Sequence, residues 1–391
     1  MRYGMFLRGA LGVLLAASGV GCDKWEEEVL DPEQQEQGFI ILEEVAQLLS
    51  AVPLEREQMQ EVQEAAGTSA GNGYDEEYRM RDLFTAPGCG VGEEASTKAH
   101  KYSRPLRDLL REAVLGRSGT KAAEGEAEAW LDSLAVSDVQ IYWPGADTWD
   151  GHSLPVITYD PGAGAARNEG YELLPDGSVR KVMVDEQMSL ERPVWVVNRN
   201  TDADYKSLEM LRREDPSWGS GGGDILVGPT KADGDVRTLV VRSLKALRQY
   251  DSWFAGASEF WLKIGSIEKF KATSEADIRQ YDPTVTDFMI VVRRNQLEQE
   301  VPLNAVLVSE WTPQLSASAF MMVEDDGGTR TTWKASTTVK YNSKSYGIEL
   351  EIPLNSRDDI VWRGSLSYGF IEKNNGLPIR LGDVELVLEL I

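Results

Sequence analysis

From residue 236 to the C-terminus, short segments of alternating apolar and polar residues follow one another with only turn residues between them. Alternation with period two is the signal of strands that bury one face. Asn342-Ser343 and Asp326-Gly327-Gly328 are typical turn sequences. The predicted strands are 237–247, 259–267, 287–294, 305–311, 319–323, 332–341, 345–352, 360–370 and 384–390. Because no helical pattern separates them, this part of the chain is restricted to antiparallel sheets packed on each other.

The strand run therefore predicts a β-sandwich with Greek-key connections over residues 236–391. Its regular spacing resembles the C2-like and immunoglobulin-like sandwiches. That resemblance concerns architecture alone and implies no activity.

The preceding residues divide into two regions and a linker. Residues 39–135 carry apolar side chains at helical spacing and predict a small helical region. Residues 136–213 return to period two and predict a small antiparallel β module that ends in a short helix near 205–213. Residues 214–235 are rich in Gly and predict a linker. The expected fold class is mainly β, and α+β overall.

The composition limits the partners. With 391 residues, 42% of them apolar, the chain is long enough for two or three domains with substantial cores. Its formal net charge is −24, and it becomes −26 without residues 1–21, which hold two arginines and no acidic residue. Such a surface repels nucleic acid, so we expect no nucleic-acid partner.

The N-terminus has the layout of an export signal. Arg2 and Arg8 precede an apolar run over 9–20, and Gly21 stands directly before Cys22. The run is too short to span a bilayer. It resembles the lipobox of bacterial lipoproteins, which implies cleavage of a signal peptide at 1–21 and acylation, including palmitate, of Cys22. A plain secretory peptide cut elsewhere is the alternative.

Residues 22–38 are acidic and Gln-rich and predict a solvated tether. The acids that follow Cys22 resemble the export signal of some Bacteroidota lipoproteins, and the whole layout resembles the uncharacterised multi-domain surface lipoproteins of that group. The resemblance implies a protein held at the outer membrane by the lipid on Cys22, at the cell surface, with the periplasmic face as the alternative.

Residues that metal-dependent hydrolases or nucleophilic enzymes use for catalysis are scarce. His100 and His152 are the only histidines, and no His-Glu-x-x-His or Cys-x-x-Cys motif is present. A Ser–His–Asp or Cys–His arrangement would need one of these two histidines as its base. No catalytic residue is therefore assigned.

One segment offers metal ligands at suggestive spacing. Asn198, Asn200, Asp202 and Glu209 resemble the EF-hand calcium loop, with Asp204 as a further oxygen donor. Ala203 stands where such loops have glycine. The alternative is an Asx-rich turn in which Asp202 or Asp204 caps a helix that begins at Tyr205. Calcium is the one cofactor we consider, and we favour the capped turn.

Two acidic loops and the tryptophans leave further options. Residues 324–326 and 358–359 lie between predicted sandwich strands, where carboxylates can meet around calcium, but solvated loops are the expected reading. Eleven tryptophans are present, and most are expected in cores, whereas an exposed one stacks on sugars or anchors an interface.

We therefore expect a non-enzymatic surface protein that binds a glycan or a protein through its β domains. The alternative is a carboxylate-dependent hydrolase such as a glycosidase, because that chemistry needs no histidine.

Overall fold

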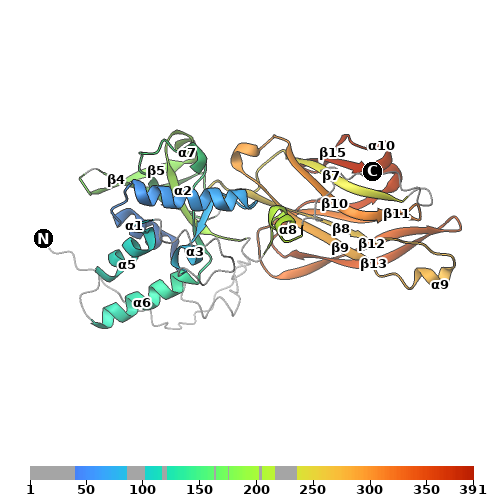
Figure 1. The fold of residues 1–391 in the computed structure, drawn as a ribbon, viewed down its shortest axis with the longest axis horizontal. Coiled ribbons are helices and arrows are strands. Elements are labelled where there is room, and N and C mark those ends of the chain that lie inside the picture. The colour runs from blue at the N-terminus through green and yellow to red at the C-terminus, as the bar shows by residue number, and fades with distance from the viewer. Residues whose placement is uncertain are drawn as a thin grey trace, which may run out of the picture. The chain divides into compact units, whose positions relative to one another are not determined.

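The computed structural model describes residues 40–85, 102–116, 121–162, 164–174, 176–201, 205–215 and 236–391 (Figure 1). These ranges belong to one compact unit, Ile40–Ile391. Several predictions concern residues outside this description. They are the predicted signal peptide, Cys22, the predicted tether, Asp202, Asp204 and most of the predicted linker. Within the described ranges, no helix combines the length and the apolar character needed to cross a membrane.

The helices expected from the N-terminal pattern are present and pack on a sheet. Helix α1 buries Val45, Leu48 and Leu49, which lie on one face because they are three and four residues apart. This face shares a core with Ile141 and Trp195 of the sheet. The helices are α1 (Leu42–Ala51), α2 (Arg56–Gly71), α3 (Met80–Phe84), α5 (Leu106–Gly116) and α6 (Lys121–Ala135).

The sheet has six strands in the order β1-β2-β6-β3-β4-β5. We predicted an antiparallel module, but β3 and β6 pair in parallel, so the sheet is mixed. The hairpin of β4 and β5 followed by α7 provides the long connection that a parallel pair requires. The elements are β1 (Glu77–Arg79), β2 (Val139–Tyr142), β3 (Val156–Tyr159), β4 (Arg167–Leu173), β5 (Val179–Asp185), α7 (Glu186–Glu191) and β6 (Val194–Arg199), with a 3-10 turn η1 (Ala146–Thr148) after β2.

The C-terminal part is a sandwich of antiparallel sheets, which confirms the mainly β, α+β class. One sheet has the order β10-β7-β16-β15, and the other has β13-β12-β11-β8-β9 with β14 paired to β11. Phe260, Leu262, Phe320 and Leu386 are among the fully buried side chains of the core. The strands are β7 (Arg237–Ala246), β8 (Ser258–Ser266), β9 (Thr284–Val292), β10 (Val301–Trp311), β11 (Leu315–Glu324), β12 (Arg330–Tyr341), β13 (Lys344–Asn355), β14 (Asp359–Ser367), β15 (Pro378–Leu381) and β16 (Val384–Leu390).

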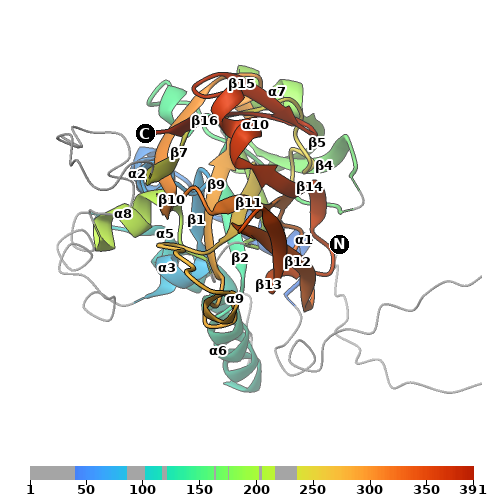
Figure 2. The same ribbon diagram turned by 90° about the vertical axis from the view of Figure 1, so that its right-hand side faces the viewer.

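The long β12–β13 hairpin forms a third layer. Its two-residue turn is Asn342-Ser343, as predicted, and both residues have positive φ, which matches the twist of a tight hairpin. Figures 1 and 2 show the hairpin on the side of β8 and β11 that faces away from β7 and β16. Gly265 permits this close packing, since a Cβ there would lie 2.1 Å from Leu350 Cδ1.

Local differences from the sequence prediction occur at the ends of elements. The expected strand 360–370 ends early, because Ser367 caps the short helix α10 (Tyr368–Lys373) by accepting a hydrogen bond from Phe370 N. The helix expected from Tyr205 begins later, as α8 (Leu208–Glu214), and buries Leu208 in the sandwich core. Two further short turns are helical, α9 (Glu275–Ile278) and η2 (Arg294–Gln296).

Candidate functional site

Three carboxylates meet at one end of the sandwich. Glu324 is the last residue of β11, Glu259 is the second residue of β8, and Asp251 lies in the loop that joins β7 to β8. One carboxylate oxygen from each lies within 4.8 Å of the other two. The strand pairing sets this arrangement, because Phe260 faces Glu324 and Asp325 N donates to Glu259 O. We refer to Asp251, Glu259 and Glu324 as the acidic triad.

The acidic triad is buried. Glu324 is 0% exposed and Glu259 is 8% exposed, while Asp251 is partly buried. Neither carboxylate oxygen of Glu324 accepts a hydrogen bond from an amide or a hydroxyl within the described residues, and the same holds for Asp251 Oδ2. Burying an ionised carboxylate without a partner is costly, so the charge must be compensated by a proton or by a cation.

The electrostatics of the triad follow from this burial. Burial raises the pKa of Glu324 far above its ordinary value, and a carboxyl–carboxyl hydrogen bond with Asp251 raises it further, followed by the charges of Asp251, Asp326 and Asp359. Burial also raises the pKa of Asp251, which the positive charge of Arg294 opposes. The arrangement can therefore do one of two things chemically, namely share protons among its carboxyl groups or bind a cation.

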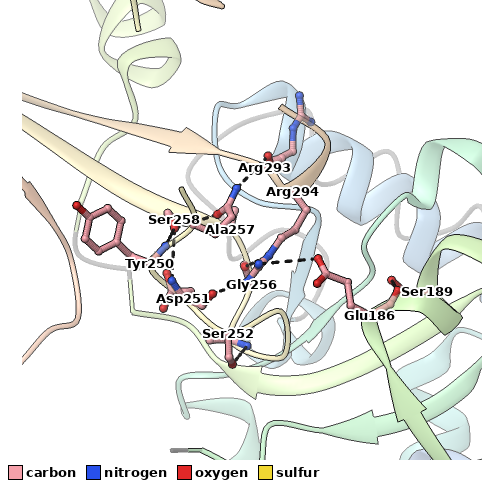
Figure 3. A network of polar contacts seen from close by, with 12 residues as sticks. Glu186, Ser189, Tyr250, Asp251, Ser252, Gly256, Ala257, Ser258, Arg293 and Arg294 are labelled. Carbon is pink, nitrogen blue, oxygen red and sulfur yellow. Dashed lines mark hydrogen bonds and ion pairs between the residues drawn. The ribbon is translucent and has the colours of Figure 1, made fainter. Parts of the chain in front are cut away.

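The loop that carries Asp251 is tied down by Arg294 (Figure 3). The Arg294 guanidinium donates to Gly256 O at 3.0 Å and to Asp251 O at 2.6 Å. Its Nη1 lies 3.9 Å from a carboxylate oxygen of Glu186 on α7. Ser258 Oγ accepts a hydrogen bond of 2.8 Å from the amide of Tyr250. These contacts fix both ends of the 251–257 loop.

The tip of the 251–257 loop is apolar and buried. Phe254 is 0% exposed and Trp253 is 5% exposed. Their rings pack beside Tyr142, Val184 and Val196 of the mixed sheet. The loop thus joins the acidic triad at its start to the core of the N-terminal sheet at its tip.

The expectation of solvated loops is wrong for Glu324 and Asp325, whereas the 358–359 loop is partly exposed. Glu324 is fully buried and Asp325 is 2% exposed, although Asp326 and Asp359 are exposed. Asp325 is buried because it accepts hydrogen bonds from Trp261 Nε1 at 3.2 Å, from Asn355 Nδ2 at 3.0 Å and from Gly327 N. Asp358 lies half buried beside it, and burial followed by the charge of Asp325 raises the pKa of Asp358.

The described members of the 198–209 segment have separate partners. Asn198 on β6 donates its amide to Phe254 O at 3.1 Å and also to Ala255 O. Asn200 donates to Glu77 Oε2 at 3.0 Å and to Gln140 Oε1 at 2.9 Å. Calcium binding at this segment stays a prediction, because Asp202 and Asp204 are outside the described residues.

Glu209 and the helix cap complete this segment. Glu209 lies on α8, where Arg212 Nη1 approaches its carboxylate at 3.4 Å. The cap is Ser207, whose Oγ accepts from Met210 N at 3.1 Å. The expectation that Asp202 or Asp204 caps a helix from Tyr205 is therefore wrong, because the chain turns into the helix only after Ser207.

Two open clefts lie on the described part of the molecule. One, of about 620 Å³, lies between the β12–β13 hairpin and the outer face of β11 and β14, and we name it the hairpin cleft. It is lined by Ala319, Trp333, Lys334, Ala335, Ser336, Glu349, Leu350, Glu351, Gly364 and Ser365. The other, of about 460 Å³, reaches Asp251 of the acidic triad, and we name it the loop cleft.

Several of the tryptophans belong to cores, as expected. Trp143, Trp253 and Trp311 are at most 5% exposed. Trp149 is partly exposed and packs edge-on against Trp143. Trp333, which sequence reasoning did not single out, is partly exposed and lines the hairpin cleft.

Sequence reasoning also missed Asp251 and Glu259. A signal was present for two members of the triad, because Glu259 and Glu324 stand within or directly after apolar strand segments. A charged residue inside such a segment is either exposed at an edge or compensated in the interior. Asp251 gave no such signal, because it lies in a loop among polar residues.

Comparisons with known proteins add no relative. No protein-family model, no curated protein and no solved structure matches this chain.

Proposed function

We propose that this protein is exported, anchored at the outer membrane through a lipid on Cys22, and binds a glycan at the cell surface without catalysis. The observation that carries the proposal is the hairpin cleft, an open cleft of about 620 Å³ with one aromatic ring and several polar side chains in its wall. Ligand sites combine these features, because aromatic faces stack on sugar rings and polar groups fix the orientation.

The wall of the hairpin cleft suits a polar ligand. Trp333 offers a partly exposed indole face. Lys334 and Ser336 donate hydrogen bonds, and Glu349 and Glu351 accept them. A sugar presents both donors and acceptors around an apolar ring face, so its chemistry complements this set.

The same geometry favours binding over hydrolysis. Glycosidases place two carboxyl groups on opposite sides of the scissile bond. Glu349 and Glu351 are two residues apart on β13, so they project on the same side of one strand. In the acidic triad, Glu324 is fully buried and out of reach of a polymeric substrate.

A glycan array followed by titration calorimetry tests the proposal. The purified protein is expected to bind a defined glycan class, and Trp333→Ala is expected to weaken that binding about tenfold, which corresponds to about 1.4 kcal/mol. Trp130→Ala is the matched control, because Trp130 is also partly exposed but lies on α6.

Three outcomes would contradict the proposal. If the protein bound no glycan, the proposal would be wrong. An equal loss of affinity in both tryptophan variants would show that the glycan does not bind in the hairpin cleft. Release of shorter sugars from a bound glycan would replace binding by hydrolysis.

The acidic triad is a separate feature from the hairpin cleft, and a cation there would have a structural role. The acidic triad supplies carboxylate oxygens, the donors that hard cations such as calcium and magnesium prefer. Calcium is the ion that the sequence led us to consider, and the triad brings its donors within 4.8 Å of one another.

A further inference from the structure

The acidic triad holds a buried carboxyl group, that of Glu324, whose neighbour is another carboxyl group and not a hydrogen-bond donor such as an amide or a hydroxyl. Glu324 is 0% exposed, and its carboxylate is directed at Asp251 and Glu259. We propose that Asp251, Glu259 and Glu324 bind a calcium ion that fastens the 251–257 loop to the sandwich. This inference does not depend on glycan binding in the hairpin cleft.

The donors and their spacing select the ion. All three ligands are carboxylates, and hard cations prefer oxygen. Two ligands on opposite sides of calcium are about 5 Å apart, whereas magnesium allows only about 4 Å. The three carboxylate oxygens lie within 4.8 Å of one another, a separation that the ligands of one calcium ion can have.

The loop cleft lies beside the acidic triad. It is open, has a volume of about 460 Å³, and Asp251 forms part of its wall. Asp185 and Glu186 line the same cleft and attract cations, while Arg167 and Arg294 balance part of their charge.

The consequence of binding concerns the loop. Arg294 and Asp75 already hold the 251–257 loop, since Asp75 Oδ2 accepts from Ala257 N at 2.8 Å. Gly256 has φ +131°, and a Cβ there would lie 2.9 Å from Asp75 Oδ2, so the backbone is seated closely against that carboxylate. Of the three proposed ligands, Asp251 is the only one in the loop, and the other two lie on sandwich strands. An ion shared among them links the loop, with its buried Trp253 and Phe254, to the sandwich.

The test is a calcium titration of the purified protein after treatment with EDTA. A ligand that binds only the folded state stabilises it by mass action. For a unit of this size, calcium at a hundred times its dissociation constant is expected to raise the melting temperature by about 4 °C. Amide hydrogen exchange in residues 251–257 is expected to slow under the same conditions.

Two variants connect the effect to the triad. Glu324→Gln keeps the size of the side chain and removes the charge, so the protein is expected to fold and to lose the calcium response. Asp287→Asn is the control, because Asp287 is a partly buried carboxylate on β9 outside the triad, and its calcium response is expected to persist.

The outcomes distinguish a bound calcium ion from a proton shared between carboxyl groups of the triad. A calcium response that is lost in Glu324→Gln and kept in Asp287→Asn supports the proposal. No response in the wild type, or an equal response in Glu324→Gln, overturns it in favour of protonated carboxyl groups. An equal response to magnesium overturns the assignment to calcium, and a thermal response without slower exchange in 251–257 overturns the role in fastening the loop.

Discussion

Glu76 makes the stability of this protein depend on pH. It is 8% exposed, directly follows the buried Asp75, and accepts a hydrogen bond from Gly145 N at 3.0 Å. Burial raises the pKa of Glu76 from 4.5 to about 7, the hydrogen bond from Gly145 lowers it, and the charge of Asp75 raises it. The perturbation we consider is Glu76→Gln, in which the amide oxygen can still accept from Gly145 N.

The direction in which stability changes with pH follows from the raised pKa of Glu76. Below pH 4.5 the carboxyl group is protonated in both the folded and the unfolded protein, and its contribution to stability is fully present. As the pH rises through 7, the folded protein must ionise a buried group, and that contribution is lost. The change in the pKa of Glu76 from 4.5 to about 7 corresponds to about 3 kcal/mol, at 1.36 kcal/mol per pH unit.

The assay is urea unfolding of the wild type and of Glu76→Gln between pH 4.5 and pH 8. The free energy of unfolding of the two proteins is expected to agree near pH 4.5 and to differ by up to about 3 kcal/mol at pH 8, with the variant more stable. Glu191→Gln, which changes an exposed carboxylate on α7, is the control. A variant that is less stable than the wild type at pH 8, or a difference that does not change with pH, would refute this reasoning.

Three further predictions follow from packing, capping and anchoring. Phe254→Ala is expected to lower the free energy of unfolding by about 3–5 kcal/mol in urea denaturation, because the ring is fully buried. A loss below about 1 kcal/mol would argue against this buried position of the ring. Ser207→Ala is expected to cost about 1 kcal/mol in the same assay by removing the cap of α8, so an unchanged midpoint would contradict the cap. Cys22→Ser is expected to abolish incorporation of labelled palmitate and to move the protein from the membrane fraction to the soluble fraction. Wild-type protein that stays in the membrane fraction without incorporating palmitate would refute lipid anchoring.

Periodicity was enough to predict much of the fold. The sandwich strands follow from period two, and the turn at Asn342-Ser343 follows from residues that tolerate positive φ. Helix α2, inside the predicted helical region, has a weak apolar pattern because polar side chains occupy buried positions on it. Gln58 donates to Arg104 O at 2.6 Å, and Glu61 accepts from Leu106 N at 2.7 Å, so these buried polar groups are satisfied by partners more than forty residues away.

The acidic triad shows why the site was harder to predict than the fold. Asp251 and Glu259 are close in sequence, but Glu324 comes from a strand that is three strands further along the chain. Their meeting depends on the pairing of β8 with β11 and on the shape of the 251–257 loop. The spacing of residue types along the chain contains neither piece of information. For that reason the sequence indicated a candidate metal site at 198–209 and not at the triad.

A crystal structure of the protein grown in calcium, with anomalous differences measured at a long wavelength, tests the metal site most directly. The account predicts a single strong anomalous peak in the acidic triad, about 2.3–2.6 Å from carboxylate oxygens of Asp251, Glu259 and Glu324. The contradicting result is a triad without a peak, in which oxygens of Asp251 and Glu324 lie about 2.5–2.7 Å apart and share a proton.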